Sequence, residues 1–308
     1  MNRVATFGNY QSALLDLMAA QTRALEAQDR VSSQKNATDL TGFGRQSETL
    51  TALKGAQSRL QGFVETSEAV TSRLTTQDLA LTQISDGVEA IRASIGNALA
   101  SDSATSLMLE LEGQFQTVRG GLNMRHQGGY LFAGTQVNTP PLDITNLTEL
   151  AAAPSVASIF HNDTLKTASR VAEGTTLETG FLANEVGTDV MDILRDIQNY
   201  NTGPNGPLTG KLTEDQKAWL ATQLTRLETA GQGVIDKGAT TGSLANQVDS
   251  IVKGHNAQLE SLSELVSKRT DADMAKAVTD LQLSQVAIEA SAQVINQLRQ
   301  VSLLNFLS

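Results

Sequence analysis

The chain has 308 residues, no cysteine and a formal net charge of −10 at pH 7. The lack of cysteine excludes disulfides, thiolate metal sites and thiol catalysis. The acidic balance argues against nucleic acid and anionic membranes as partners, because both reward clustered Lys and Arg. Hydrophobic residues make up 40% of the chain and aromatic residues only 4%, a composition that favours long helices packed along seams.

Two amphipathic helices are predicted at the ends of the chain, over residues 12–34 and 271–307. Each has a face too apolar to remain unpaired, so we expect the two helices to pack on each other and on further subunits. A monomer cannot bury both stripes fully, so these ends should be poorly ordered alone and fold on assembly. The expected assembly interface consists of Leu14, Leu17, Leu25, Val31, Leu281, Ile288, Ile295, Leu303, Leu304 and Leu307.

Residues 45–99 carry the clearest helical period in the chain. One apolar seam runs from Leu53 to Ile95 at steps of seven, and a second, three residues later, runs from Ala56 to Ala98. Such a pattern is typical of a coiled coil. At about 1.5 Å per residue, this helix would be a rod roughly 80 Å long.

The pattern changes beyond a second helix that is predicted to run to about Arg125. The glycine-rich stretch from Gly129 to Gly134 predicts a strand or a hairpin edge. We expect a small β-rich insert over residues 142–186, where short Thr- and Val-containing runs are separated by glycines. Thr188 is then predicted to begin a short helix.

A second long helix is predicted after Thr213, which forms a capping-box pattern with Gln216. The predicted fold class is mainly α, with long coiled-coil-like helical rods formed by the N- and C-terminal halves and a small β-rich insert. The expected domains are a terminal helical domain (1–42 and 266–308), a helical rod domain (43–141 and 187–265) and the insert (142–186). The apolar seam of the second rod consists of Leu220, Leu227, Val234, Val248 and Leu262.

Residues with catalytic or metal-binding potential are sparse and scattered. His126, His161 and His255 are far apart, and none has a second ligand at metal-binding spacing. There is no HExxH zinc motif, no GxSxG elbow and no phosphate-binding loop. We therefore expect no catalytic residue, no metal and no cofactor, and an enzyme remains conceivable only if residues 142–186 hide a site.

No segment has the apolar length that a membrane span needs, since no window approaches 18 consecutive apolar residues. The segment Met1–Phe7 lacks the apolar core of a secretory signal peptide. If the protein leaves the cell, we expect it to do so without a cleaved signal.

The terminal segments resemble the flagellin family. At the C-terminal side the resemblance rests on Lys268–Ala275 and on the ending Val301–Leu307, and at the N-terminal side on Val31–Lys35 followed by Asp39. Gln34 stands where the family usually has glycine. The motif residues carried over from the family are Ser32, Ser33, Lys35, Asp39, Tyr130, Phe132 and Gly134.

Within that family, Gly129–Gly134 together with Asn123 and Pro141 resembles the hook–filament junction members. The resemblance implies an extracellular structural subunit, exported unfolded through the flagellar channel without cleavage. It also implies a ring of identical subunits, with a neighbouring hook-associated protein on one side and filament flagellin on the other, and an export chaperone. The terminal helices would form an inner tube and the rods an outer one.

Two other readings stay open at this point. A filament flagellin shares the terminal helices and the rods. A cytoplasmic coiled-coil signalling or adaptor protein explains the heptads of residues 53–98, although it does not account for the paired terminal stripes.

Overall fold

A computed structural model describes the backbone of residues 2–307 and the side chains of residues 8–299. The fold is mainly helical with four short strands among the described residues, which confirms the predicted fold class. The chain divides into two compact units, the first formed by residues 1–59 and 258–308 and the second by residues 60–257. The elements are α1 (Asn2–Ser33), η1 (Thr41–Gln46), α2 (Ser47–Ser101), α3 (Leu107–Leu122), β1 (Arg125–His126), β2 (Gly129–Tyr130), α4 (Leu147–Ala152), η2 (Val156–Ile159), β3 (Ala168–Ala172), β4 (Thr175–Glu178), α5 (Ala183–Thr202), α6 (Glu214–Thr270) and α7 (Met274–Leu307).

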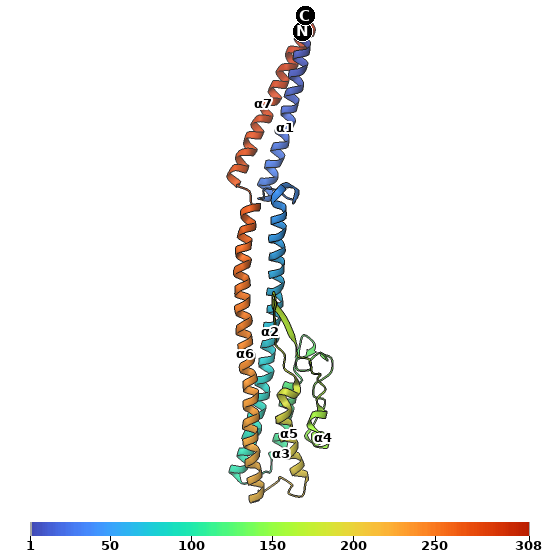
Figure 1. Ribbon diagram of the computed structural model, residues 1–308, viewed down its shortest axis with the longest axis vertical. Coiled ribbons are helices and arrows are strands. Elements are labelled where there is room, and N and C mark those ends of the chain that lie inside the picture. Colours follow the sequence, from blue (N-terminus) through green and yellow to red (C-terminus); the bar gives the residue numbers. More distant parts are fainter. Residues whose placement is uncertain (1, 308) are drawn as a thin grey trace. The chain divides into compact units, whose positions relative to one another are not determined.

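In the first unit, α1 and α7 lie side by side and run antiparallel (Figure 1). Both helices were predicted, but α1 begins well before the expected boundary at residue 12 and α7 begins at Met274. The side chain of Asp273 accepts a hydrogen bond from the Lys276 N–H at 3.1 Å. An aspartate in this position caps the free N–H groups of a helix start and complements its dipole.

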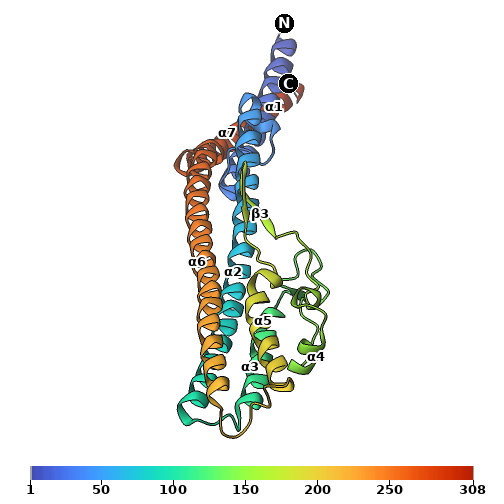
Figure 2. The same cartoon turned by 60° about the horizontal axis from the view of Figure 1, so that its bottom comes forward.

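In the second unit, α2 and α6 run side by side (Figures 1 and 2). Their contact follows the predicted steps of seven, and the seam of α2 is buried from Ser67 onward. The heptad prediction is therefore confirmed for this part of the rod. The buried apolar seam residues are Val70, Leu74, Leu81, Ile84, Val88, Ile91, Ile95 and Ala98 on α2, and Leu220, Leu227, Val234 and Val248 on α6.

The predicted capping box at the start of α6 is present. Gln216 Oε1 accepts a hydrogen bond from the Thr213 N–H at 3.0 Å, and Thr213 Oγ1 accepts one from the Gln216 N–H at 3.2 Å. The Gln216 amide also donates to Asn205 O at 3.0 Å. The box thus gives hydrogen-bond partners to two backbone N–H groups at the start of the helix, and Gln216 holds the preceding loop against it.

A buried polar pair interrupts the apolar seam between α2 and α6. Gln77 Nε2 donates to Thr241 Oγ1 at 3.0 Å, and both side chains are buried. The pair lies between two apolar clusters, one containing Val70 and Leu74 and the other beginning at Ala80. The seam is therefore not uniform along its length, because one layer of it is held by a hydrogen bond.

Helices α3 and α5 pack beside the rod in the second unit (Figure 2). Helix α5 begins at Ala183, so the predicted start at Thr188 is wrong. Two hydrogen bonds accompany the earlier start: the Leu182 N–H donates to Glu185 Oε2 at 3.2 Å within the first turn, and the Ala183 N–H donates to Phe132 O at 2.9 Å. The helix start is thus fixed by a contact with a segment that is distant in sequence.

The β structure within residues 142–186 consists of one antiparallel hairpin, β3–β4, and an isolated bridge between Leu142 and Phe160; the segment also contains the short helices α4 and η2. An irregularity in the pairing between Arg170 and Ala172 leaves Val171 out of register. Val171 is fully buried and packs with Val70, Leu74 and Val248 of the rod. A bulge redirects the side chain of one strand residue, and here it places the Val171 side chain in the apolar seam of the rod.

The backbone of Val171 also contacts the rod. His255, buried on α6, places Nε2 at 2.9 Å from Val171 O. A carbonyl only accepts, so His255 Nε2 carries the hydrogen. The imidazole is stacked on the Phe63 ring, with 5.7 Å between the centroids.

We expect Val171→Ala to destabilise the second unit by about 2 kcal/mol, because it removes buried apolar atoms and leaves a cavity in the rod seam. Urea unfolding of the full chain measures this. Leu165→Ala is the matched control, since Leu165 precedes the hairpin and is exposed. Equal losses of unfolding free energy in the two variants would show that burial of Val171 does not stabilise the second unit.

Candidate assembly surfaces

Small side chains form the seam between α1 and α7. Ala13, Ala20 and Ala27 of α1 are buried at steps of seven, and Ala277 and Ser284 of α7 are buried at the same step. Side chains of this size let two helix backbones approach closely. They also contribute little apolar burial, because stabilisation scales with the area removed from water.

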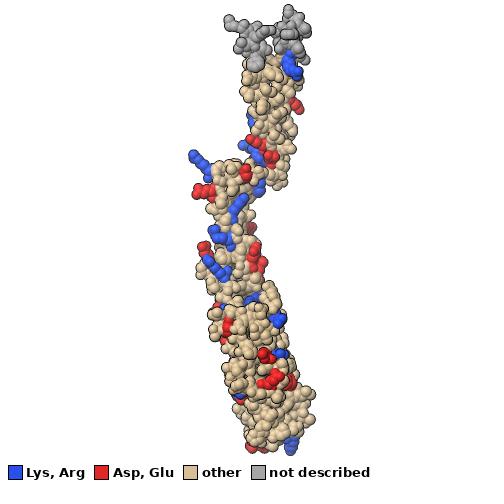
Figure 3. Space-filling model, turned by 90° about the vertical axis from the view of Figure 1, so that its right-hand side faces the viewer, with Lys and Arg blue, Asp and Glu red and all other residues tan. Residues whose placement is uncertain are grey.

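Large apolar side chains lie on the outer faces of the same helices. The fractional exposure is 64% for Leu25 and 63% for Leu283. On the face seen in Figure 3, few Lys, Arg, Asp or Glu side chains lie over the α1–α7 pair toward its described upper end. Large exposed apolar patches mark interaction sites in soluble proteins, and each of these two helices exposes several large apolar side chains. The exposed members are Leu14, Leu15, Met18 and Leu25 on α1, and Met274, Val278, Leu283, Val286 and Val294 on α7.

The residues predicted for assembly fall into three groups. Leu14 and Leu25 are exposed on α1 and available to another molecule. Five are half-buried: Leu17, Val31, Leu281, Ile288 and Ile295. Leu303, Leu304 and Leu307 belong to α7 but lie outside the residues whose side chains the structure describes. The sequence did not single out Leu15, Met18, Leu283, Val286 or Val294.

The loops that follow α1 and α6 are tied together within the first unit. Lys35 forms an isolated β-bridge and an ion pair with Asp271. The Asn36 N–H donates to Thr270 O at 2.7 Å, and the Ala272 N–H donates to Gln34 O at 2.9 Å. The predicted motif residue Lys35 therefore closes the junction between N- and C-terminal segments, more than 200 residues apart in sequence.

The junction carboxylate is strongly stabilised in its charged form. Hydrogen bonds from Lys35, then Ser267 and Thr270, lower the pKa of Asp271 from 3.8 to about 2. A lowered folded-state pKa adds stability that is complete above pH 4 and is lost as the pH falls through about 2. The pair is solvent-exposed, so its contribution is small and screened by salt.

We expect Asp271→Asn to lower the thermal stability of the terminal unit at pH 5 and to have almost no effect at pH 2, where wild-type Asp271 is also becoming protonated. Circular dichroism melts at both pH values measure the difference. Asp273→Asn is the control, because asparagine can still accept the Lys276 hydrogen bond. A deficit of equal size at pH 2 and pH 5 would contradict the assigned role.

The turn after α1 keeps a conformation suited to glycine although its residue is Gln34. Gln34 has φ 58°, in the left-handed region, where a side chain costs roughly 1 kcal/mol. Asp39, further along the loop, accepts hydrogen bonds from Thr41 Oγ1 at 2.7 Å and from the Gly42 N–H at 2.9 Å. These bonds lower the pKa of Asp39. Of the serines, Ser33 is half-buried and Ser32 exposed, and each bonds Asp29 O.

The Gly129–Gly134 stretch is half-buried at its start and buried from Leu131 onward. Leu131, Phe132 and Ala133 are almost fully buried, while Tyr130 is half-buried and accepts a hydrogen bond from Arg125. Gly134 has φ 68°, and a Cβ added there would overlap Asp163 Oδ1. The motif residues Tyr130, Phe132 and Gly134 therefore have structural roles here.

Asn123 clamps the start of the insert. Its Nδ2 donates to Leu142 O at 2.6 Å, and its Oδ1 accepts from the Leu142 N–H at 3.0 Å. The amide thus pairs with the backbone as a neighbouring strand would, directly after Pro141. Pro141 O in turn accepts a hydrogen bond from the His161 N–H at 2.9 Å.

The three histidines lie in separate surroundings. His126 contacts Thr76, His161 lies 3.7 Å from an Asp143 oxygen at the surface, and His255 lies in the rod seam. Among the described side chains, no three His, Asp or Glu residues gather in a metal-binding arrangement. None of the helices in the described range is both long and apolar enough to cross a bilayer.

Comparison with known proteins adds to this geometry. Residues 224–307 match the family model of the bacterial flagellin C-terminal helical region. The search of curated proteins found no match.

Solved structures of flagellar proteins share the fold. A structure described as a flagellar hook-associated protein from Vibrio parahaemolyticus is 15% identical, with a TM-score of 0.60 over 75% of this chain and 100% of that chain. FlgL of Bacillus cereus is 15% identical, with a TM-score of 0.53 over 70% and 98% of the two chains. FlgL of Xanthomonas campestris is 14% identical, with a TM-score of 0.51 over 68% and 99%. Residues 224–307, which comprise most of α6 and all of α7, thus resemble the flagellin C-terminal helical region, and the chain shares the fold of flagellar hook-associated proteins.

Proposed function

We propose that this chain is a structural subunit of the bacterial flagellum that joins the hook to the filament. The observation that carries the proposal is the packing of α1 and α7, in which small side chains face inward and large apolar side chains face outward. Their mutual seam is made of alanine and serine, whereas Leu25, Leu283 and their neighbours face outward. A helix pair of this kind gains most of its apolar burial from contacts with other molecules.

The partners follow from that role. The terminal helices pack against identical subunits in a ring, with a neighbouring hook-associated protein on one side and filament flagellin on the other. An export chaperone covers the terminal helices before assembly. The work of the chain is mechanical rather than enzymatic, and its location is the flagellum outside the cell, reached without a cleaved signal.

We also keep the domain assignment as part of the proposal. Residues 1–42 and 266–308 form the inner tube, and residues 43–141 and 187–265 the outer one. Residues 142–186 form the small β-rich insert. The Lys35–Asp271 junction lies near both proposed boundaries of the terminal domain, whereas the compact units divide at residues 59–60 and 257–258, within α2 and α6.

Immunogold labelling of isolated flagella tests the function. A narrow band at the hook end supports the junction role, and label along the whole filament would instead identify a filament flagellin. Recovery of the protein only in the cytoplasm would reject both and favour a coiled-coil adaptor. Growth of long filaments from the purified chain alone would likewise count against the junction.

A further inference from the structure

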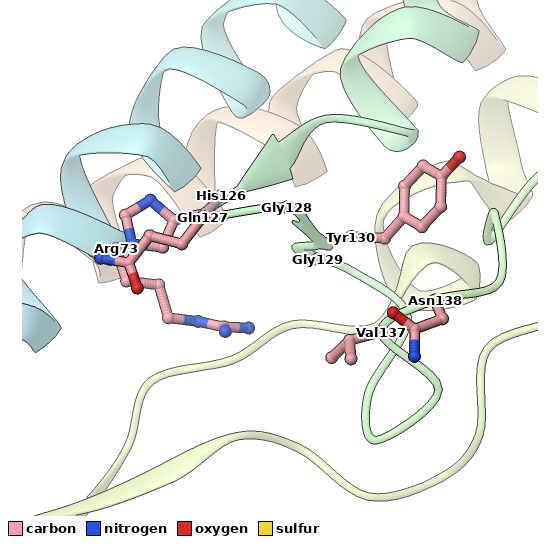
Figure 4. Close-up of a pocket in the computed structure, with 8 residues that line it drawn as sticks. All are labelled: Arg73, His126, Gln127, Gly128, Gly129, Tyr130, Val137 and Asn138. Atoms are coloured by element: carbon pink, nitrogen blue, oxygen red, sulfur yellow. The ribbon is translucent and has the colours of Figure 1, made fainter.

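A groove of about 480 Å³ opens between α2 and the β1–β2 hairpin of the second unit (Figure 4). Its walls are Arg73 of α2, the hairpin residues His126–Tyr130, and Val137 and Asn138 of the following loop. The only charged side chain in this lining that is cationic at every ordinary pH is that of Arg73, and the lining contains no carboxylate.

The walls of the groove are held in place without a ligand. Gln127 and Gly128 both have positive φ, 49° and 88°, as a tight hairpin turn requires. The Tyr130 N–H donates to Val137 O at 2.8 Å. Such a preformed site loses little conformational entropy when it binds.

His126 is fixed by a second contact with α2. Thr76 Oγ1 donates its hydrogen to Ser72 O at 3.1 Å and lies 2.9 Å from His126 Nδ1. The ring therefore stays in one orientation at the edge of the groove.

Arg73 is tethered but lacks an anionic partner. Its Nη2 donates to Leu131 O at 2.9 Å, and its Nε is buried without a hydrogen-bond partner. No ion pair among the described side chains includes Arg73, whereas Arg226 pairs with both Asp192 and Asp196. Nη1 and the second hydrogen of Nη2 remain free to donate.

This arrangement leaves a partly desolvated charge uncompensated. Burial lowers the pKa of Arg73, because the charged guanidinium loses hydration. A charge in this position is costly until an opposite charge meets it. The chain has ten more Asp and Glu than Lys and Arg residues. Acidic side chains are therefore plentiful, yet none pairs with Arg73 among the described ion pairs.

We propose that this groove binds a carboxylate, supplied in the assembled structure by an Asp or Glu side chain of an adjoining protein subunit. That the carboxylate comes from an adjoining subunit rests on the proposed function. That the groove binds a carboxylate does not. A guanidinium is planar and matches a carboxylate with two parallel hydrogen bonds. The Val137 side chain supplies an apolar wall beside it, and the Asn138 amide adds a polar group at the rim.

Acetate is the probe for the chemistry. The full chain, labelled with ¹⁵N-arginine, is titrated with sodium acetate and separately with sodium chloride at constant ionic strength. We expect a saturable shift of the Arg73 Nε–H resonance with acetate that chloride does not reproduce. Arg73→Lys identifies the resonance by removing it. Equal shifts with both salts would overturn the carboxylate site.

Two loop variants make this test specific. Asn138→Glu places a carboxylate at the rim and should weaken acetate binding by roughly 10-fold, whereas Gln136→Glu adds the same charge to the same loop outside the lining and should change it by less than about twofold. Both positions are exposed, so neither variant should disturb folding. Equal effects of the two would also overturn the site.

Incorporation into flagella tests the source of the carboxylate. Asn138→Glu should reduce incorporation relative to Gln136→Glu, because the rim then repels the incoming acidic side chain. Equal incorporation would overturn the assignment to an adjoining subunit. If the wild-type chain itself is not found in flagella, the proposed function fails, and the acetate titration still decides whether the groove binds carboxylates.

Discussion

Replacement of Leu25 and Leu283 together by glutamate should abolish incorporation of the chain into flagella and leave the monomer as stable as wild type. Both side chains are exposed on the terminal helices, so the variants should alter monomer stability by less than about 0.5 kcal/mol each. In an assembled tube, an unpaired carboxylate in an apolar contact costs at least about 3 kcal/mol, which corresponds to a loss of roughly 100-fold or more in assembly.

The matched control is Leu109→Glu. Leu109 is 79% exposed on α3, in the second unit, and is replaced by the same residue. Quantitative blotting of purified flagella measures incorporation, and thermal melts of the monomer measure stability. Normal incorporation of the double variant would refute the assembly role of this face. Loss of monomer stability would show that the two leucines pack within the chain.

Gly134→Ala should destabilise the second unit by about 2–4 kcal/mol. Two causes add: a left-handed backbone that disfavours side chains, and a Cβ that overlaps Asp163 Oδ1 and stands 2.8 Å from Leu165 O. Asp163 cannot easily move aside, because it accepts hydrogen bonds from the Leu165 N–H at 3.0 Å and from Thr135. Those bonds, chiefly that of Thr135, lower the pKa of Asp163.

Gly128→Ala separates the two causes. Gly128 also has positive φ, 88°, but nothing lies within 4 Å of an added Cβ. This variant should lose only about 1 kcal/mol, the cost of the backbone conformation. Urea unfolding of the full chains gives both values. Losses of the same size would mean that Asp163 yields to the new methyl group and that steric overlap contributes nothing.

The features that sequence predicts well are those with a local physical cause. The steps of seven from Val70 to Ala98 predict a buried seam because a helix returns to the same face at that interval. The Thr213–Gln216 box was recognisable for the same reason, since both hydrogen bonds are made within four residues. The fold class followed from such patterns alone.

The terminal seam was harder to anticipate because hydrophobicity points to the wrong residues. The sequence directs attention to leucines, yet Ala20 and Ala27 form the contact between α1 and α7 and Leu15 lies outside. The useful signal is the repeat of small residues at 13, 20 and 27 and again at 277 and 284. The half-burial of Leu17 and Leu281 shows that the seam is flanked, rather than filled, by larger side chains.

Other features have no local cause and could not be predicted. The Lys35–Asp271 bridge joins residues 236 positions apart. Val171 reaches the rod only because the β3–β4 pairing slips next to it. The start of α5 at Ala183 depends on Phe132 O, which the chain brings there by folding. The groove at Arg73 is likewise formed by segments that are far apart in sequence.

The Gln77–Thr241 hydrogen bond bears on the alignment of α6 along α2, which an apolar seam of equal repeats does not fix by itself. Seams of Leu, Ile and Val at equal steps of seven would pack almost as well after α6 slid along α2 by one repeat, about 10 Å. That displaced alignment would bury Gln77 and Thr241 against apolar side chains, each without the other. A buried polar pair therefore favours one alignment of two otherwise repetitive helices, the alignment in which His255 also meets the hairpin.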